Sequence, residues 1–163
     1  MDLDRLVHSL AGPAVFWLDG HWSGEKTYGQ GDECPLLNEI ESINRSPHEH
    51  FVFIDDARLF MSPPPRPHLP DEWPTIVQVL DVLRAGGRTP YVVVFSDVII
   101  ACPGAAKSLI SEWAQTAATQ LWEAESRNSA QQSMSKSESP KQLIRKGARL
   151  IAKAFLPRNQ ATR

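Results

Sequence analysis

The stretch that most constrains the fold is residues 51–60, with the sequence FVFIDDARLF. Its first four residues are β-branched or aromatic with no polar residue among them, a pattern typical of a strand buried on both faces of a parallel sheet. The run ends at two adjacent carboxylates, Asp55 and Asp56. Because ligands of open α/β sheets lie beyond the carboxyl ends of the strands, these acids are candidates for chemistry.

A second apolar run, residues 14–18, is built in the same way and stops at Asp19, with His21 two positions later. Residues 22–49 separate the two runs and are long enough for the helical crossover that joins parallel strands. If the runs are neighbouring strands of one parallel sheet, we expect Asp19 and His21 to meet the two carboxylates of the other run at one edge.

Three carboxylates at one edge, Asp19, Asp55 and Asp56, repel one another unless a cation or protons intervene. Oxygen-only ligation favours a hard divalent ion such as Mg²⁺, so the pattern predicts a metal site. Two alternatives remain open: the acidic pair caps the following loop and helix while Asp19 is solvated, or Arg58 neutralises the pair. His21 is either a base or a histidine that packs within its loop.

The composition indicates one folded domain. The chain has 163 residues, of which 42% are hydrophobic, and it contains five tryptophans. Cys34 and Cys102 form no metal or redox spacing and are expected to be reduced structural thiols. The histidines at 48, 50 and 68 fall in loops without ligand spacing, so no role is predicted for them. The acidic N-terminus and the short apolar runs favour a cytoplasmic protein.

Turn chemistry and hydrophobic periodicity predict the remaining elements. Residues 62–74 hold six of the 13 prolines, which excludes a helix or an interior strand and favours a stiff loop beside the site. The runs 91–95 and 98–102 are separated only by Ser96 and Asp97, which predicts a tight antiparallel hairpin with Asp97 as a turn residue. The predicted helices cover residues 3–10, 35–43, 74–83 and 105–124.

The charge is distributed unevenly along the chain. Residues 1–125 carry 8 Lys/Arg and 18 Asp/Glu, whereas residues 126–163 carry 9 Lys/Arg and one Glu. This asymmetry suggests separate roles for an acidic body and a basic tail. We therefore expect a domain over residues 1–125, a flexible Ser/Gln/Asn-rich linker over 126–140, and a basic amphipathic helix and tail over 141–163.

The predicted tail helix has apolar residues on one face and basic residues mostly elsewhere. It is suited to an anionic membrane surface, RNA or an acidic partner, although docking on its own acidic body, or disorder, is the other interpretation. Sequence-specific nucleic-acid binding is disfavoured, because no aromatic residue or recognised module accompanies the basic residues. The expected apolar face consists of Leu143, Gly147, Leu150, Ile151, Ala154 and Phe155.

Three blocks of the sequence together resemble a known family. They are residues 16–24 (FWLDGHWSG), 34–40 (CPLLNEI) and 53–60 (FIDDARLF). In this order they resemble the C-terminal half of bacterial class I S-adenosylmethionine-dependent methyltransferases of the FkbM-like group, over about residues 3–103. The resemblance implies a partial Rossmann-like α/β sheet, with parallel strands plus a C-terminal antiparallel hairpin, flanked by helices.

The spacing of the acids is also similar to that of metal-dependent O-methyltransferases, which hold Mg²⁺ with one Asp after the fourth strand and an acidic pair after the fifth. This similarity implies that Asp19, Asp55 and Asp56 are metal ligands and that His21 is a base or an added ligand. A metal that holds a substrate hydroxyl lowers its pKa and orients its oxygen toward the methyl donor.

Methyltransferases of this class bind S-adenosylmethionine through a glycine-rich turn after their first strand, and this sequence has no such turn. We therefore expect a C-terminal portion that is inactive alone and presents an unpaired sheet edge to a missing half or a partner chain. The expected activity of the whole is O-methyl transfer. The alternative is a non-enzymatic interaction protein that binds an anionic surface or partner through its basic helix.

Overall fold

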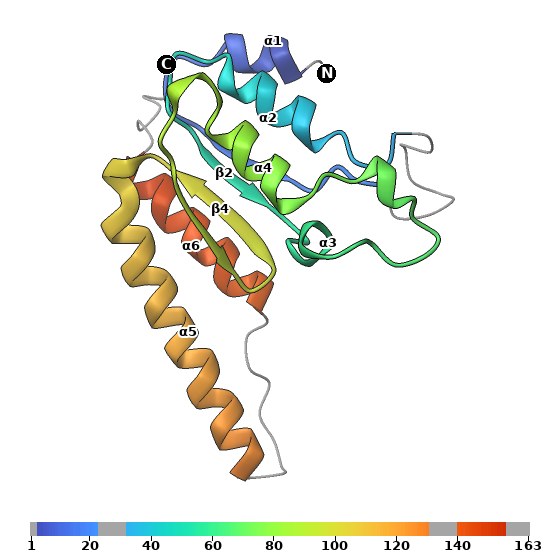
Figure 1. Ribbon diagram of the computed structural model, residues 1–163. Helices are drawn as coiled ribbons and strands as arrows, with labels where there is room; N and C mark the ends of the chain where they lie inside the picture. Colours follow the sequence, from blue (N-terminus) through green and yellow to red (C-terminus); the bar gives the residue numbers. More distant parts are fainter. Residues whose placement is uncertain (1–2, 23–31, 131–139, 156–163) are drawn as a thin grey trace, which may run out of the picture.

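The computed structural model describes residues 3–22, 32–130 and 140–155, and its centre is a four-stranded mixed sheet (Figure 1). The strand order is β1-β2-β4-β3. The strands β1 (Val15–Leu18) and β2 (Phe51–Ile54) are parallel, and β4 (Val98–Cys102) is antiparallel both to β2 and to β3 (Tyr91–Phe95). The α/β class, the parallel pair and the antiparallel hairpin predicted from the sequence are confirmed.

The register of the parallel pair makes both strands end at the same level. Val15 lies opposite Phe51, and Leu18 lies opposite Ile54. The amide of Asp55 extends the ladder by donating a hydrogen bond to the carbonyl of Leu18 at 3.0 Å. All four residues of β2 are buried, as expected for a strand covered on both faces. The residues that follow the two strands therefore emerge side by side.

The hairpin between β3 and β4 uses the two-residue turn that the sequence predicts. Phe95 pairs with Val98, and the two residues between them have positive φ angles, 46° for Ser96 and 71° for Asp97. This is the mirror-image type of turn that matches the twist of the flanking strands, and Asp tolerates the left-handed conformation better than most residues.

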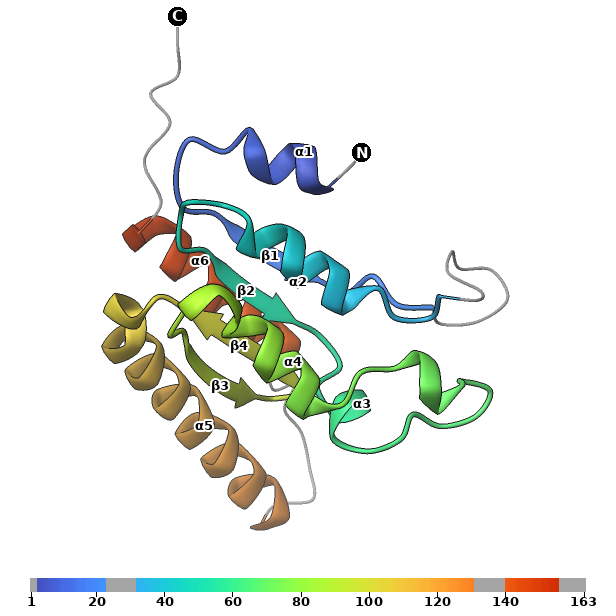
Figure 2. The ribbon, with the colours of Figure 1, turned by 45° about the horizontal axis from the view of Figure 1, so that its top comes forward.

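Helices cover both faces of the sheet (Figures 1 and 2). On one face lie α1 (Leu3–His8), α2 (Leu36–Asn44) and α4 (Ile76–Leu83). On the other lie α5 (Lys107–Ala130) and α6 (Pro140–Phe155). The short helix α3 (Arg58–Met61) follows β2 directly. Within the described ranges there are also three 3₁₀ turns: η1 (Pro70–Glu72), η2 (Ala85–Gly87) and η3 (Gly104–Ala106).

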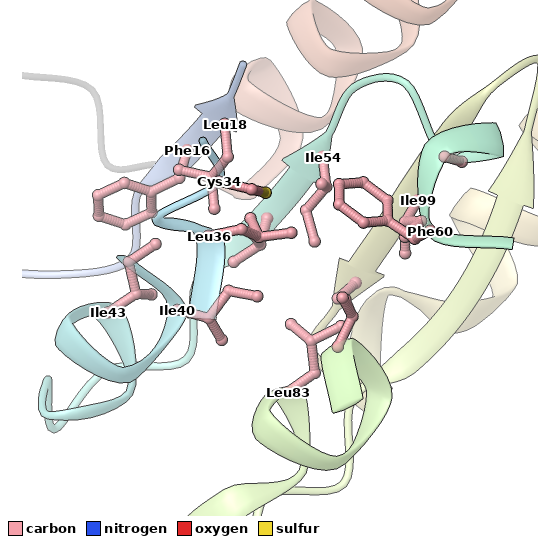
Figure 3. Close-up of a cluster of buried hydrophobic side chains, with 14 of the residues drawn as sticks. Phe16, Leu18, Cys34, Leu36, Ile40, Ile43, Ile54, Phe60, Leu83 and Ile99 are labelled. Carbon is pink, nitrogen blue, oxygen red and sulfur yellow. The ribbon is translucent and has the colours of Figure 1, made fainter. Parts of the chain in front are cut away.

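Strand alternation divides the core into two clusters. The first lies between the sheet and α1, α2 and α4, and includes Val52 and Ile54 of β2 (Figure 3). The second lies between the sheet and α5 and α6, and includes Phe51 and Phe53 of β2. Both cysteines are buried and unbridged, as expected, and burial raises the pKa of each thiol to about 11.

The predicted linker differs from the structure at its start. The helix α5 continues to Ala130, so residues 126–130 are helical rather than part of a linker. Those five residues contain neither Gly nor Pro, and nothing in them ends a helix. At its other end, Pro140, which is predicted as the last residue of the linker, is the first residue of α6. Residues 131–139 of the predicted linker, and residues 156–163, lie outside the described residues.

The helix α6 packs against the sheet with a face that matches the predicted one only in part: Gly147 and Ile151 are buried as predicted, and Ile144 is buried in addition. Ile144 and Ile151 are fully buried in the second cluster, whereas Leu150 is 57% exposed and Ala154 is exposed. Gly147 explains the orientation: a Cβ atom there would lie 2.3 Å from the ring of Trp113 in α5. The close approach at this glycine fixes which side of α6 faces inward, and Leu150 consequently turns outward.

In the part of the chain that the structure describes, no helix combines the length and the apolar character needed to cross a membrane.

Candidate metal site

The carboxyl ends of β1 and β2 bring three of the predicted site residues together. One potential ligand atom each from Asp19, His21 and Asp56 lies within 4.8 Å of the other two. His21 is between the two acids, with Nδ1 3.8 Å from Asp19 Oδ1 and Nε2 3.4 Å from Asp56 Oδ2. The convergence predicted from the parallel pair is therefore present for these three residues.

Asp55 is not part of this group, although the sequence places it among the ligands. Its carboxylate accepts a hydrogen bond from the backbone amide of Asp56 at 2.9 Å and another from Lys141 Nζ at 3.1 Å. The register of the parallel pair places Asp55 beside Asp19, because the residues before them, Ile54 and Leu18, are opposite each other. The Asp55 carboxylate is instead engaged by these two contacts, with the amide of Asp56 and with Lys141.

Asp56 adopts a conformation that is uncommon outside glycine. Its φ angle is 57°, in the left-handed region, which Asp and Asn enter more readily than other residues. This turn ends β2 and presents the Asp56 side chain, which is 13% exposed, to His21. A residue held in a sparsely populated backbone region next to a cluster of polar side chains is typical of functional sites.

Arg58 and Asp97 hold one oxygen of Asp56 in place. Arg58 Nη1 lies 2.8 Å from Asp56 Oδ1 and also contacts Asp97 Oδ2. Asp97 accepts from the amide of Arg58 through Oδ1 and from the amide of Ala57 through its carbonyl, both at 2.8 Å. The turn between β3 and β4 thus holds the residues that follow β2. The sequence predicts Asp97 only as a turn residue, and this contact is an additional role for it. Asp56 Oδ2 still faces His21.

Glu39 of α2 is a further acid at this edge that sequence reasoning did not single out. A Cβ atom on Gly20 would lie 3.2 Å from Glu39 Oε1, so the glycine leaves room for the carboxylate. Burial raises the pKa of Glu39. The sequence signal was present only as the position of Glu39 within one of the three family-like blocks.

The local electrostatics are unfavourable for Asp19 as a free carboxylate. Burial raises its pKa, as do the charges of Asp55 and Asp56, while His21 and Lys141 act in the opposite direction. A raised carboxylate pKa means that the folded protein disfavours the negative charge there. A bound cation would relieve this repulsion.

Comparisons with known proteins do not identify a family for this chain. A scan against protein-family models finds no match, and neither the curated proteins nor the solved structures that were searched include one that is significantly similar.

Proposed function

We propose that this chain provides the metal-binding and substrate-binding side of a class I S-adenosylmethionine-dependent methyltransferase, and that the reaction is O-methyl transfer assisted by a divalent cation. The observation that carries the proposal is the convergence of Asp19, His21 and Asp56 at the carboxyl ends of two parallel strands. A parallel pair beside an antiparallel hairpin, covered by helices on both faces, is the arrangement that the family resemblance implies.

The donor set fits a divalent cation. Two carboxylates suit Mg²⁺ and Mn²⁺, and an imidazole adds affinity for Mn²⁺ and other transition metals. A bound cation would supply Lewis-acid chemistry, lowering the pKa of a substrate hydroxyl. We assign His21 to the ligand set because its ring nitrogen lies within the converging group. A role for His21 as the base stays a prediction.

The chain's own residues would prepare Asp56 for this task. Arg58 engages Asp56 Oδ1, and Asp97 in turn engages Arg58, so the carboxylate is oriented while Oδ2 is directed toward His21. Hydrogen bonds to a ligating carboxylate commonly fix its orientation and contribute to metal affinity.

S-adenosylmethionine does not fit the pocket next to this site. The pocket, lined in part by Asp19, His21 and Glu39, has a volume of only about 10 Å³, far less than the roughly 300 Å³ at which ligand pockets usually begin. In the proposal a partner chain supplies its binding site, and the outer edge of β1, which pairs with no further strand among the described residues, is available to it.

Titration with Mn²⁺, followed by its electron paramagnetic resonance signal, tests the cation site. We expect one ion per chain and a loss of affinity of at least about tenfold in Asp56→Asn. Asn is the suitable replacement because it tolerates the left-handed conformation of residue 56.

Asp81→Asn, which changes an exposed aspartate of α4, is the matched control and should bind as the native protein does. The proposal fails if Mn²⁺ binds equally well to the native protein and to Asp56→Asn, or if the native protein binds none.

One observation favours a second function, binding to an anionic lipid surface. The apolar side of α6 is occupied by the core, but its outer side carries four exposed cations, Arg145, Lys146, Arg149 and Lys153. We propose that this outer side contacts anionic headgroups electrostatically, without insertion of the helix, because Ile144 and Ile151 are not free to enter the bilayer.

Flotation with vesicles of phosphatidylcholine and phosphatidylserine tests this second function. Each cation near the surface contributes about 1 kcal/mol, so replacing Arg145, Arg149 and Lys153 together with Gln should weaken binding roughly 100-fold. High salt should have a similar effect, and vesicles of phosphatidylcholine alone are the control. Undiminished binding of the triple variant would exclude this surface.

A further inference from the structure

Lys141, the second residue of α6, lies next to the acidic residues that follow β2, although it is near the other end of the chain. Lys141 Nζ lies 3.1 Å from Asp55 Oδ2 and 4.0 Å from Asp56 Oδ1. The lysine and Asp55 are 86 residues apart in sequence. Lys141 thus pairs with one acid beside the candidate metal site and lies close to a proposed ligand of that site.

Burial makes this pair more than a surface contact. The side chain of Asp55 is only 3% exposed, and a buried carboxylate is costly unless a cation or hydrogen bonds compensate its charge. The amide of Asp56 and the ammonium of Lys141 provide that compensation. The hydrogen bond with Asp55 raises the pKa of Lys141, so the ammonium keeps its proton at neutral pH.

The rest of α6 holds the lysine in position independently of this ion pair. Ile144 and Ile151 are buried in the second cluster, and Gly147 packs against Trp113 of α5. The first turn of the helix is therefore presented to the acids by contacts further along the same helix. By contrast, the Lys141 side chain is 54% exposed and has room to turn away.

We propose that Lys141 and a divalent cation compete for this edge. With Lys141 on Asp55, the ammonium repels a cation at Asp19, His21 and Asp56 and keeps Asp55 out of the ligand set. Without it, the cation binds more tightly and Asp55 becomes available as a fourth ligand. The inference rests on the proposed cation site.

Coulomb's law gives the scale of the competition. A single charge acting on a divalent ion at about 6 Å changes the affinity roughly tenfold even at the dielectric constant of water, and more in a partly buried site. Thermodynamic reciprocity adds a second consequence. If the pairing of Lys141 with Asp55 weakens the binding of the cation, then the bound cation must weaken the pairing of Lys141 with Asp55 by the same factor.

Mn²⁺ titration of Lys141→Met tests the inference. We expect affinity at least about tenfold tighter than in the native protein. Lys107→Met, which removes an exposed lysine that lies over the ring of Tyr91, should stay within about twofold. Tyr91 pairs with Cys102 at the end of the sheet opposite the carboxyl ends of β1 and β2, so screening by salt leaves this charge little effect on the site. In the double variant Asp55→Asn/Lys141→Met both charges of the pair are removed, and the gain should largely disappear.

The outcomes separate the inference from the proposed function. If the native protein binds Mn²⁺ and Lys141→Met binds no more tightly, the cation site stands and the competition is wrong. If only Lys141→Met binds, the competition is supported and the native chain does not use the site for a cation. If neither binds, both proposals fail.

A measurement on the native protein guards against a variant that does not fold. In the nuclear magnetic resonance spectrum, the side-chain ammonium signal of Lys141 should shift on saturation with Mg²⁺ as the lysine leaves Asp55. An unchanged Lys141 signal, with Mg²⁺ bound, would overturn the inference.

Discussion

Lowering the pH from about 6.5 to about 4 is expected to remove about 3 kcal/mol from the free energy of unfolding through one side chain, His50. His50 is 8% exposed, and its Nδ1 accepts a hydrogen bond from the backbone amide of Ala14 at 3.0 Å. Its Nε2 has no hydrogen-bond partner among the described residues. The surroundings of His50 therefore favour the neutral form of its imidazole ring.

The sign of the effect follows from the pKa. Burial lowers the pKa of His50 from 6.5 to about 4, with further contributions from His48 and Arg88. The unfolded chain takes up the proton near pH 6.5, whereas the folded protein resists it until about pH 4. The stabilisation is thus complete above pH 6.5 and is lost progressively as the pH falls between these two values.

Denaturant unfolding at a series of pH values checks this expectation. The variant His50→Asn keeps an acceptor for the amide of Ala14 but does not titrate, so its stability should change much less between pH 6.5 and 4. If the free energy of unfolding of the native protein changes as little over this range as that of His50→Asn, His50 is not the source of the pH dependence.

The parts of the fold that follow from local pattern were predictable. Two uninterrupted apolar runs that each end in an acid specify neighbouring parallel strands, and the equal end points of these strands place Asp19 beside Asp56. The hairpin could be predicted because two residues are too few for any other connection between adjacent strands.

The features that depend on distant contacts could not be predicted. The pairing of Arg58 with Asp56 is one of the alternatives that the sequence leaves open. Nothing in the spacing of the sequence shows that Lys141 pairs with Asp55, or that Asp97 of the hairpin turn joins Arg58. The periodicity of α6 places Gly147 and Ile151 on the inward face but assigns Leu150 to it in place of Ile144, and the contacts with the sheet and α5 decide between these two.

Two histidines show the same limit. His50 and His68 lie in segments that read as loops, and neither has ligand spacing in the sequence. Each gains its partner from a residue more than thirty positions away, Ala14 for His50 and Glu33 for His68. Glu33 itself lies at the edge of a stretch that looks like an exposed glycine-containing loop, yet it is buried.

Replacement of Glu33 by Ala is expected to cost about 3 kcal/mol of stability at neutral pH. Glu33 Oε2 accepts hydrogen bonds from Trp73 Nε1 at 2.7 Å and from the amide of Leu69 at 3.2 Å, and lies 3.2 Å from His68 Nδ1. One carboxylate thus fastens the proline-rich loop to the chain before α2. Burial alone raises the pKa of Glu33, but the hydrogen bonds outweigh burial and lower it.

The same contact connects this loop to the metal site. The ring of Trp73 lies 5.3 Å from that of His21 and 6.0 Å from that of Phe60. Loss of the Glu33 acceptor leaves the buried indole N–H of Trp73 unpaired, which frees the ring to move away from His21. Glu33→Ala should therefore weaken Mn²⁺ binding as well as stability, even though Glu33 is not a ligand.

Chemical denaturation at pH 7 of the native protein, Glu33→Ala and Glu33→Gln checks this prediction. Gln keeps a side-chain oxygen that can accept from Trp73, so its cost should be about 1 kcal/mol, the difference between a charged and a neutral acceptor. Because the pKa of Glu33 is lowered in the folded protein, its contribution is complete above its usual value of 4.5 and is lost as the pH falls below that value. If Glu33→Ala unfolds at the same denaturant concentration as the native protein, the carboxylate does not anchor the loop, and the position of Trp73 against His21 must depend on its apolar contacts instead.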